Sequence, residues 1–371
     1  MDLDTPLWPG TPRNPPAVTH LHPAGPEGPD QEPAPPPHPF PAGPFPADPQ
    51  PAARDTRQTD APAAPAPRTS RLLRPEDYLT EPDEPPQMGW RSAAWRLGMQ
   101  RIRPGRREQE HWSWQEMIRE PVTSPKIIAV FSPKGGVGKS TTALQLGHVL
   151  AMVRGDLAVA LDANPDSGNL VKRMKEPHSR RSADDLHRDA ERLHRYTDLL
   201  PYLTRADSGL CVVRSNPDAS TRLGPDEYRR ILQVLSQYYA FTVADLGTGM
   251  REPAFLAIME AADALVAVTE PAFDAAEVAI EGIDWLNQQF PEKIRAGTVV
   301  INSVRAGSAP IDAGRLAGDF DLYVDQVLEV PHDPHLATGG VPRWPLLARS
   351  AQDAYLKLTS TIVDLLQPAS G

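Results

Sequence analysis

Residues 132 to 142 read Ser-Pro-Lys-Gly-Gly-Val-Gly-Lys-Ser-Thr-Thr, and they directly follow the apolar run Ile127-Ile128-Ala129-Val130-Phe131. A short apolar run bounded by turn-forming residues is typical of a buried strand. The glycines that follow allow the backbone to take positive φ and to approach an anion without a Cβ in the way. The order of strand, glycine-rich turn and helix predicts a phosphate-binding loop at the end of a strand.

The loop offers two kinds of contact to a phosphate group. Backbone amides of the turn point at the anion, and the positive end of the following helix adds to the field. Lys139 would place a charge on the β- and γ-phosphate oxygens, and the Ser140 hydroxyl would ligate Mg²⁺. Pro133 departs from the strict P-loop pattern, and a plain turn without a ligand is the alternative. The expected nucleotide contacts are Lys134, Gly135, Gly136, Val137, Gly138, Lys139, Ser140 and Thr141.

The stretch Lys-Gly-Gly-Val-Gly-Lys-Ser-Thr at residues 134–141 resembles the deviant Walker A motif of the ParA/MinD family of ATPases. In that family the first glycine position is variable and the early lysine is the hallmark. The resemblance implies ATP and Mg²⁺ as cofactors and an ATP-dependent homodimer, in which Lys134 reaches the phosphates bound by the partner subunit. It covers about residues 125–366, roughly two thirds of the chain.

A second predicted strand ends in Leu-Asp-Ala-Asn-Pro-Asp at residues 161–166, which resembles the family's switch I segment. The resemblance makes Asp162 an outer-sphere Mg²⁺ ligand and gives the next polar position a role in orienting the attacking water. That position is Asn164 here, and an amide can hydrogen-bond a water but cannot act as a general base. We therefore expect slow hydrolysis, or substitution by Asp166. A capping turn without catalytic meaning is the alternative.

The fourth predicted strand ends in Val-Ala-Asp-Leu-Gly-Thr-Gly at residues 243–249, which looks like a Walker B strand running into switch II. Asp245 would hold the Mg²⁺ shell through water. Gly247 and Gly249 would let the backbone approach the γ-phosphate and change conformation on hydrolysis. A strand-ending aspartate in an ordinary turn is the alternative.

Two later segments resemble the parts of the family that contact the base. A strand at residues 298–302 ends in Asn302, which the family uses on the adenine edge. The sequence Val-Pro-His-Asp-Pro at residues 330–334 resembles the late loop beside the base, and it contributes Pro331 and Asp333. Turn chemistry alone is the alternative for both. We assign no catalytic role to the Val-Thr-Glu-Pro segment at residues 268–271.

Apolar runs separated by helical patterns predict an α/β fold with a doubly wound, mainly parallel sheet. We expect helices at 139–153, 225–239 and 351–366, and a polar surface excursion at 174–208. Ligands bind at the carboxyl ends of such strands, where the candidate residues lie. The expected strands are 126–131, 157–161, 209–213, 241–245, 264–269, 298–302 and part of 321–330.

The composition divides the chain into three parts. Of its 43 prolines, 25 precede Arg91, and such a segment cannot bury enough apolar surface to offset its ordering entropy. We predict a disordered proline-rich arm at 1–87, a basic and aromatic linker at 88–124 and an ATPase domain at 125–371. The arm is either a spacer or a docking site for a partner protein. The linker, with six arginines from Arg91 to Arg107, either packs on the domain or binds a protein, an anionic membrane or nucleic acid.

A single cysteine, Cys211, excludes a disulfide framework and argues against the Fe–S reductases of the same superfamily. The sequence lacks a signal peptide and a membrane-length apolar run, so we expect a cytoplasmic protein, with recruitment to the inner face of the plasma membrane left open. Within the family, the sequence looks most like actinobacterial members associated with type VII secretion. The features that carry this likeness are Val153-Arg154-Gly155-Asp156, residues 161–166, Met88-Gly89-Trp90-Arg91 and the proline-rich arm.

Three functions fit these patterns. The first is a slowly hydrolysing Mg-ATP switch that forms a sandwich dimer and positions or regulates a partner in secretion, septum or partition machinery. The second is a non-hydrolysing ATP-binding regulatory protein, which Asn164 motivates. The third is a ParA-type DNA-partitioning ATPase, which requires a basic surface that the sequence does not display.

Overall fold

The computed structural model describes residues 105–155, 157–164, 168, 170–175, 178–216, 222–307 and 311–367. The predicted proline-rich arm, the basic linker before Gly105 and the alternative catalytic residue Asp166 lie outside the described residues.

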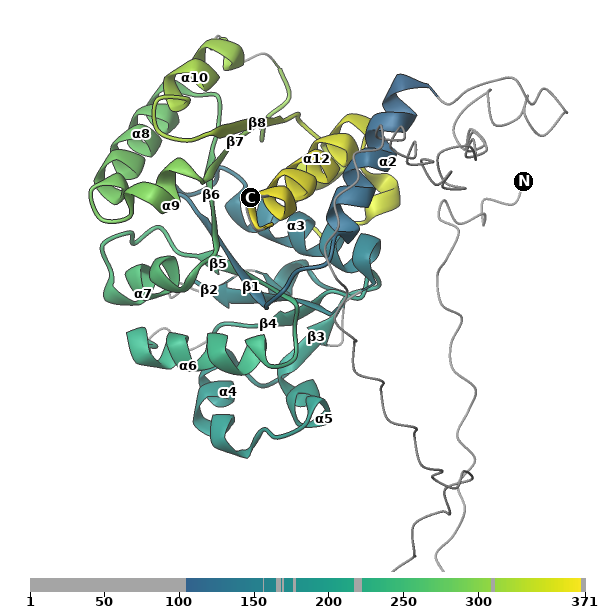
Figure 1. Cartoon of the computed structure of the whole chain (residues 1–371), viewed down its shortest axis with the longest axis vertical. Coiled ribbons are helices and arrows are strands. Elements are labelled where there is room, and N and C mark those ends of the chain that lie inside the picture. The colour runs from purple at the N-terminus through teal and green to yellow at the C-terminus, as the bar shows by residue number, and fades with distance from the viewer. Residues whose placement is uncertain are drawn as a thin grey trace, which may run out of the picture. The chain divides into compact units, whose positions relative to one another are not determined.

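An eight-stranded sheet forms the centre of the domain, in the order β3-β4-β2-β5-β1-β6-β7-β8 (Figure 1). Neighbouring strands run parallel except β3 and β4. The strands are β1 (Lys126–Phe131), β2 (Ala158–Ala163), β3 (Leu203–Arg205), β4 (Cys211–Val213), β5 (Phe241–Leu246), β6 (Ala264–Thr269), β7 (Thr298–Asn302) and β8 (Gln326–Val330). The predicted doubly wound, mainly parallel fold is confirmed.

Helices cover both faces of this sheet. The longer ones are α2 (Arg106–Arg119), α3 (Lys139–Arg154), α6 (Pro225–Ser236), α7 (Pro253–Ala261), α8 (Phe273–Asn287), α10 (Ala313–Phe320) and α12 (Arg349–Leu365). The short ones are α4 (Ala183–Asp189), α5 (Tyr196–Leu199), α9 (Pro291–Arg295) and α11 (Pro334–Ala337). Helices α2, α3 and α12 contribute to the core on one face, and α4 and α6 to α10 to the core on the other.

The strand sequences explain the two cores. In β1, Ile128 and Val130 belong to the core with α3 and α12, whereas Ala129 and Phe131 belong to the opposite core. Successive side chains of a strand point to opposite faces, so a strand that is apolar throughout is buried on both. This continuous apolar character made the strand positions predictable.

The sequence did not predict helices α7 to α11, strand β3 or helix α2, and the last two show most clearly why. Strand β3 is a three-residue edge strand that pairs antiparallel with β4, too short to produce an apolar run. Helix α2 lies within the predicted basic linker, but it packs against α12 and α3 (Figure 1). Ile118 is fully buried there, and His111 Nε2 lies 2.8 Å from Asp353 Oδ1.

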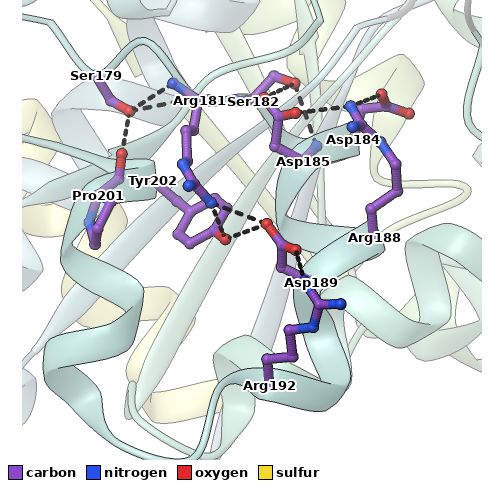
Figure 2. Close-up of polar contacts among 10 residues, drawn as sticks. All are labelled: Ser179, Arg181, Ser182, Asp184, Asp185, Arg188, Asp189, Arg192, Pro201 and Tyr202. Carbon is purple, nitrogen blue, oxygen red and sulfur yellow. Dashed lines mark hydrogen bonds and ion pairs between the residues drawn. The ribbon is translucent and has the colours of Figure 1, made fainter.

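The polar segment predicted as a surface excursion is tied together by its own side chains, as Figure 2 shows. Ser182 and Asp185 form a capping box that begins α4. The Asp189 carboxylate accepts hydrogen bonds from Arg181 Nη1 at 2.9 Å and from the Tyr202 hydroxyl at 2.7 Å. The hydrogen bond from Tyr202 lowers the pKa of Asp189. Charged residues thus fix a compact unit beside the β3 edge.

Among the helices that the structure describes, none combines the length and the apolar character needed to cross a membrane.

Candidate functional site

The glycine-rich loop joins the end of β1 to the start of α3. Gly136 has φ 85° and Gly138 has φ 89°, a region that favours glycine. No atom lies within 4 Å of a Cβ built at Gly135 or Gly136, so this side of the loop is open. A Cβ at Gly138 would lie 2.0 Å from Asn302 Nδ2, so the loop also packs closely against the end of β7. The loop is therefore open at Gly135 and Gly136, like a cradle, and is packed against Asn302 at Gly138.

Lys139 and Asp245 form a buried ion pair at the start of α3. Lys139 Nζ lies 2.5 Å from Asp245 Oδ1, and both side chains are less than one tenth exposed. The other carboxylate oxygen, Asp245 Oδ2, is buried without a hydrogen-bond partner among the described residues. Such an oxygen is costly unless another group binds it. It is therefore a natural acceptor for a metal-bound water.

Asp162 lies beside this pair. Asp162 of β2 and Asp245 of β5 are register partners in adjacent parallel strands, and both are fully buried. Burial raises the pKa of Asp162 to about 7, and the charge of Asp245 adds to the effect. Its carboxylate accepts hydrogen bonds from the backbone N–H of Leu170 at 3.1 Å and of Asn164 at 3.3 Å. Two buried aspartates thus lie beside one lysine, and a cation bound between them would favour the ionised form of Asp162.

Lys134 is held by carboxylates of its own chain. Its Nζ lies 2.8 Å from Asp274 Oδ2 and 3.3 Å from Glu270 Oε1. The hydrogen bond to Asp274 raises the pKa of Lys134 and the same bond lowers the pKa of Asp274. Glu270 belongs to the segment after β6 to which the sequence assigned no role, and Asp274 lies in the first turn of α8. The only sequence signal for either residue was that Glu270 is an acidic residue directly after a predicted strand.

The predicted base-contacting residues have structural partners as well. Asn302 Nδ2 donates to the backbone carbonyl of Val137 at 2.8 Å and so fixes the loop. Both oxygens of Asp333 accept backbone amides, from Leu336 at 2.9 Å and from Ala348 at 2.7 Å. Asp333 therefore begins α11 as its N-cap, which is the turn chemistry considered from the sequence.

The remaining predicted residues lie around the same strand ends. Asn164 is half-buried just after β2, Gly247 is buried just after β5, and Pro331 is half-buried just after β8. Ser140 is half-buried in the first turn of α3. The Thr141 hydroxyl accepts a hydrogen bond from Arg173 Nη1. Arg173 was not predicted, because it follows no strand and belongs to no recognisable motif.

The donor set fits a nucleotide with Mg²⁺. The open glycine cradle suits phosphate, and two buried carboxyl groups, one with the unpartnered oxygen Asp245 Oδ2, suit a divalent cation. Ser140, Asp162 and Asp245 are the residues that would hold the metal and its waters. Lys139 and the backbone of residues 135–141 would hold the phosphates.

Comparison with known proteins supports this interpretation. Residues 128–312 match the CobQ/CobB/MinD/ParA nucleotide binding domain. The ESX-1 secretion-associated protein EspI of Mycobacterium tuberculosis is 29% identical over 286 residues, which cover 75% of this chain and 42% of that protein. The septum site-determining protein MinD of Bacillus subtilis is 27% identical over 190 residues, 48% of this chain and 65% of that protein. The chain thus spans about two fifths of the length of EspI.

Solved structures show the same fold. The cell division ATPase MinD of Pyrococcus furiosus aligns with a TM-score of 0.52 and 19% identity over 65% of this chain and 99% of that chain. A ParA family ATPase from Chlorobium tepidum aligns with a TM-score of 0.51 and 18% identity over 66% of this chain and 98% of that chain.

Fold and site together define a nucleotide-binding domain of the P-loop class. More particularly, the chain is a ParA/MinD-like protein.

Proposed function

We propose that this protein is a Mg²⁺- and ATP-dependent molecular switch that hydrolyses ATP slowly and forms a sandwich dimer in its ATP-bound form. The observation that carries the proposal is the buried Lys139–Asp245 pair beside Asp162, at the mouth of the open glycine loop. Among the described residues, the Lys139 ammonium pairs with Asp245, so this ammonium could bind a phosphate instead, and Asp245 would then hold water of the Mg²⁺ ion.

Each residue has a defined task in this switch. Lys139 neutralises phosphate charge, Asp162 and Asp245 hold the metal waters, and the backbone amides of residues 135–141 orient the phosphates. Bound Mg-ATP supplies the phosphoanhydride bond whose cleavage resets the switch. Asn302 keeps the loop in its binding conformation through the Val137 carbonyl.

Lys134 supports the dimer part of the proposal. Its side chain is 28% exposed and pairs with the exposed Asp274 and with Glu270, which is 12% exposed. Surface ion pairs are weak, so the pair can open at little cost when a better anion arrives. We infer that this anion is the phosphate bound by a second copy of the chain.

Asn164 favours slow turnover, and it also motivates the second candidate, a regulatory protein that binds ATP without hydrolysing it. Its side chain can orient a water but cannot accept a proton. Phosphoryl transfer depends mainly on positioning and charge neutralisation, so an amide in place of a carboxylate at this position slows the reaction more readily than it abolishes it.

The partner belongs to the proposal too. EspI is by name an ESX-1 secretion-associated protein, so we infer a role for the switch in secretion machinery. We further propose that the arm at 1–87 and the basic and aromatic linker at 88–124 deliver the domain at 125–371 to its partner. Helix α2, which packs on α12 and α3, would attach the linker to the domain.

The direct test is ATP binding by a Lys139→Ala variant, measured by isothermal titration with Mg-ATP. Loss of a charged phosphate contact should weaken binding roughly 10- to 100-fold. Lys357→Ala, an exposed lysine of α12, is the matched control and should bind as the wild type does. Unchanged affinity of Lys139→Ala would show that the loop does not bind phosphate.

Turnover separates the two candidate functions. The steady-state release of phosphate from Mg-ATP should be slow for the wild type and several-fold faster for Asn164→Asp, because a carboxylate can accept the proton of the attacking water. A Lys139→Ala control sets the background rate. No turnover above that background in either protein would leave the non-hydrolysing regulator as the function.

A further inference from the structure

A cavity of about 390 Å³ lies beside the candidate nucleotide site, between the start of α6 and the segment that joins β5 to α7. Helices α6 and α7 lie side by side there (Figure 1). Ala163 and Leu246 line the cavity, and each comes one residue after a site aspartate, Asp162 or Asp245. Whatever occupies the cavity therefore contacts both strand ends that hold the metal-binding carboxylates.

The lining defines the class of ligand. Leu223, Tyr228, Phe255 and Ile258 provide apolar and aromatic walls, and Pro225 and Pro253 add rigid apolar surface. The charged residues of the lining are Arg222 and Glu252, which pair with each other at 3.2 Å. An apolar pocket of this size with a single polar pair suits an uncharged aromatic side chain with a polar backbone beside it.

The chain itself contains a segment with this chemistry. Pro-Phe-Pro occurs twice in the proline-rich arm, at Pro39-Phe40-Pro41 and at Pro44-Phe45-Pro46. A phenylalanine between prolines loses little conformational freedom on docking, because the prolines already restrict the backbone. Aromatic-lined grooves recognise proline-rich segments in this way. About 60 residues separate Phe45 from α2, roughly 200 Å of contour length, enough to reach any face of a domain this size.

We propose that this cavity is a docking site for the Pro-Phe-Pro sequences of the chain's own arm, with Phe40 or Phe45 as the buried anchor. Tyr228 of the cavity wall is buried. Burial raises the pKa of its hydroxyl, and the charges of Asp162 and Glu252 contribute to the increase.

Docking would also act on the segment after β5. Glu252 Oε1 lies 2.7 Å from the position of a Cβ built at Gly249, so this carboxylate rests on the backbone of the segment. An anchor in the cavity would contact Glu252, and through this side chain it would affect the backbone at Gly249. This coupling rests on the proposed switch, whereas docking itself does not.

The test uses a fluorescein-labelled peptide of residues 37–48 and full-length protein without nucleotide, with binding followed by fluorescence anisotropy. In Phe40→Ser/Phe45→Ser protein the arm lacks its anchors, and we expect saturable peptide binding. The wild type should bind the peptide about tenfold more weakly, because its own arm competes at high effective concentration. Equal binding by the two proteins, or no saturable binding up to about 1 mM peptide, would overturn the proposal.

Variants of the cavity locate the binding site. Added to the Phe40→Ser/Phe45→Ser protein, Ala254→Trp fills the cavity and Leu223→Asp places a charge in its apolar wall. Each should reduce peptide affinity at least about tenfold, provided that circular dichroism shows a folded protein. Gln288→Trp, an exposed position away from the cavity, should leave affinity unchanged. Undiminished binding by the folded cavity variants would exclude this site, and since nucleotide is absent, a failure of ATP binding cannot produce that result.

Discussion

Gly138 and Asn302 meet at the back of the phosphate loop, and their contact shows how closely the site is built. The glycine has φ 89°, and the asparagine amide occupies the space that a Cβ would need. Asn302 in turn donates to Val137 O, one residue before the glycine. The C-terminal residue of β7 thus fixes the conformation of the loop that connects β1 to α3.

We predict that Gly138→Ala destabilises the protein, whereas Gly135→Ala does not. The first substitution forces an L residue into a left-handed conformation and against Asn302, which should lower the free energy of unfolding by roughly 1–3 kcal/mol. The second adds a methyl group where no atom lies within 4 Å. Urea unfolding of both variants measures the difference, and equal stability of the two would contradict the packing described.

Helix α3 carries a buried histidine whose charge state affects the stability of the whole helix. His148 Nδ1 lies 2.6 Å from Ser208 Oγ, in the turn between β3 and β4. Burial lowers the pKa of His148 from 6.5 to about 4. At pH values between about 4 and 6.5, the folded protein therefore binds fewer protons at this site than the unfolded chain does. The free energy of unfolding consequently falls as the pH decreases through that range.

A His148→Gln variant should remove this part of the pH dependence. Between pH 7.5 and pH 5 the wild type should lose roughly 2 kcal/mol relative to the variant, because only the wild type must protonate this site on unfolding. His194→Gln, at an exposed position, should retain the slope of the wild type. Denaturant unfolding across this pH range tests the expectation, and parallel slopes for wild type and His148→Gln would refute it.

Helix α2 shows that sequence composition and packing can disagree at the level of an element. Its arginines and tryptophans give it the composition expected of a linker. In the structure, however, Ile118 packs into the core with α3 and α12, and Arg107 Nη2 lies 2.5 Å from Asp353 Oδ2 of α12. Polar residues such as His111 and Gln115 are buried there as well. A helix that buries polar side chains has no clear apolar stripe and is hard to recognise from its sequence.

Across the whole molecule, the residues predicted to bind the nucleotide lie at the carboxyl ends of β1, β2, β5 and β7. Lys134 lies at the same end, beside Glu270 and Asp274. A second copy that faces this end would meet Lys134 first among the cations of the loop, because Lys139 is buried. This arrangement is what a nucleotide-dependent sandwich dimer requires.

We predict that Mg-ATP doubles the mass of the wild type, and that Lys134→Ala remains monomeric while it still binds ATP. Sedimentation velocity gives the mass and isothermal titration gives the affinity. Lys357→Ala controls for the loss of a surface charge. If Lys134→Ala dimerises with ATP as the wild type does, the lysine does not act across the interface.

Much of the fold and of the candidate site could be predicted, because they depend on local patterns. Strands that are apolar throughout are buried on both faces, and residues at their carboxyl ends converge by topology, as Asp162 and Asp245 do. Glu270 and Asp274 could not be predicted as partners of Lys134, because they lie about 140 positions away and follow no motif. The same holds for Arg173 beside Thr141.

The amino-acid sequence alone thus predicted the parallel strands of the sheet, the glycine-rich loop and the order of the strand-end residues, since hydrophobic period and glycine spacing act over a few neighbouring positions. The folded chain added the pairing of Lys139 with Asp245, the attachment of Lys134 to α8, the capping role of Asp333 and the cavity between α6 and α7. Each of these depends on distances between segments far apart in the chain, which arise only when the sheet brings the segments together.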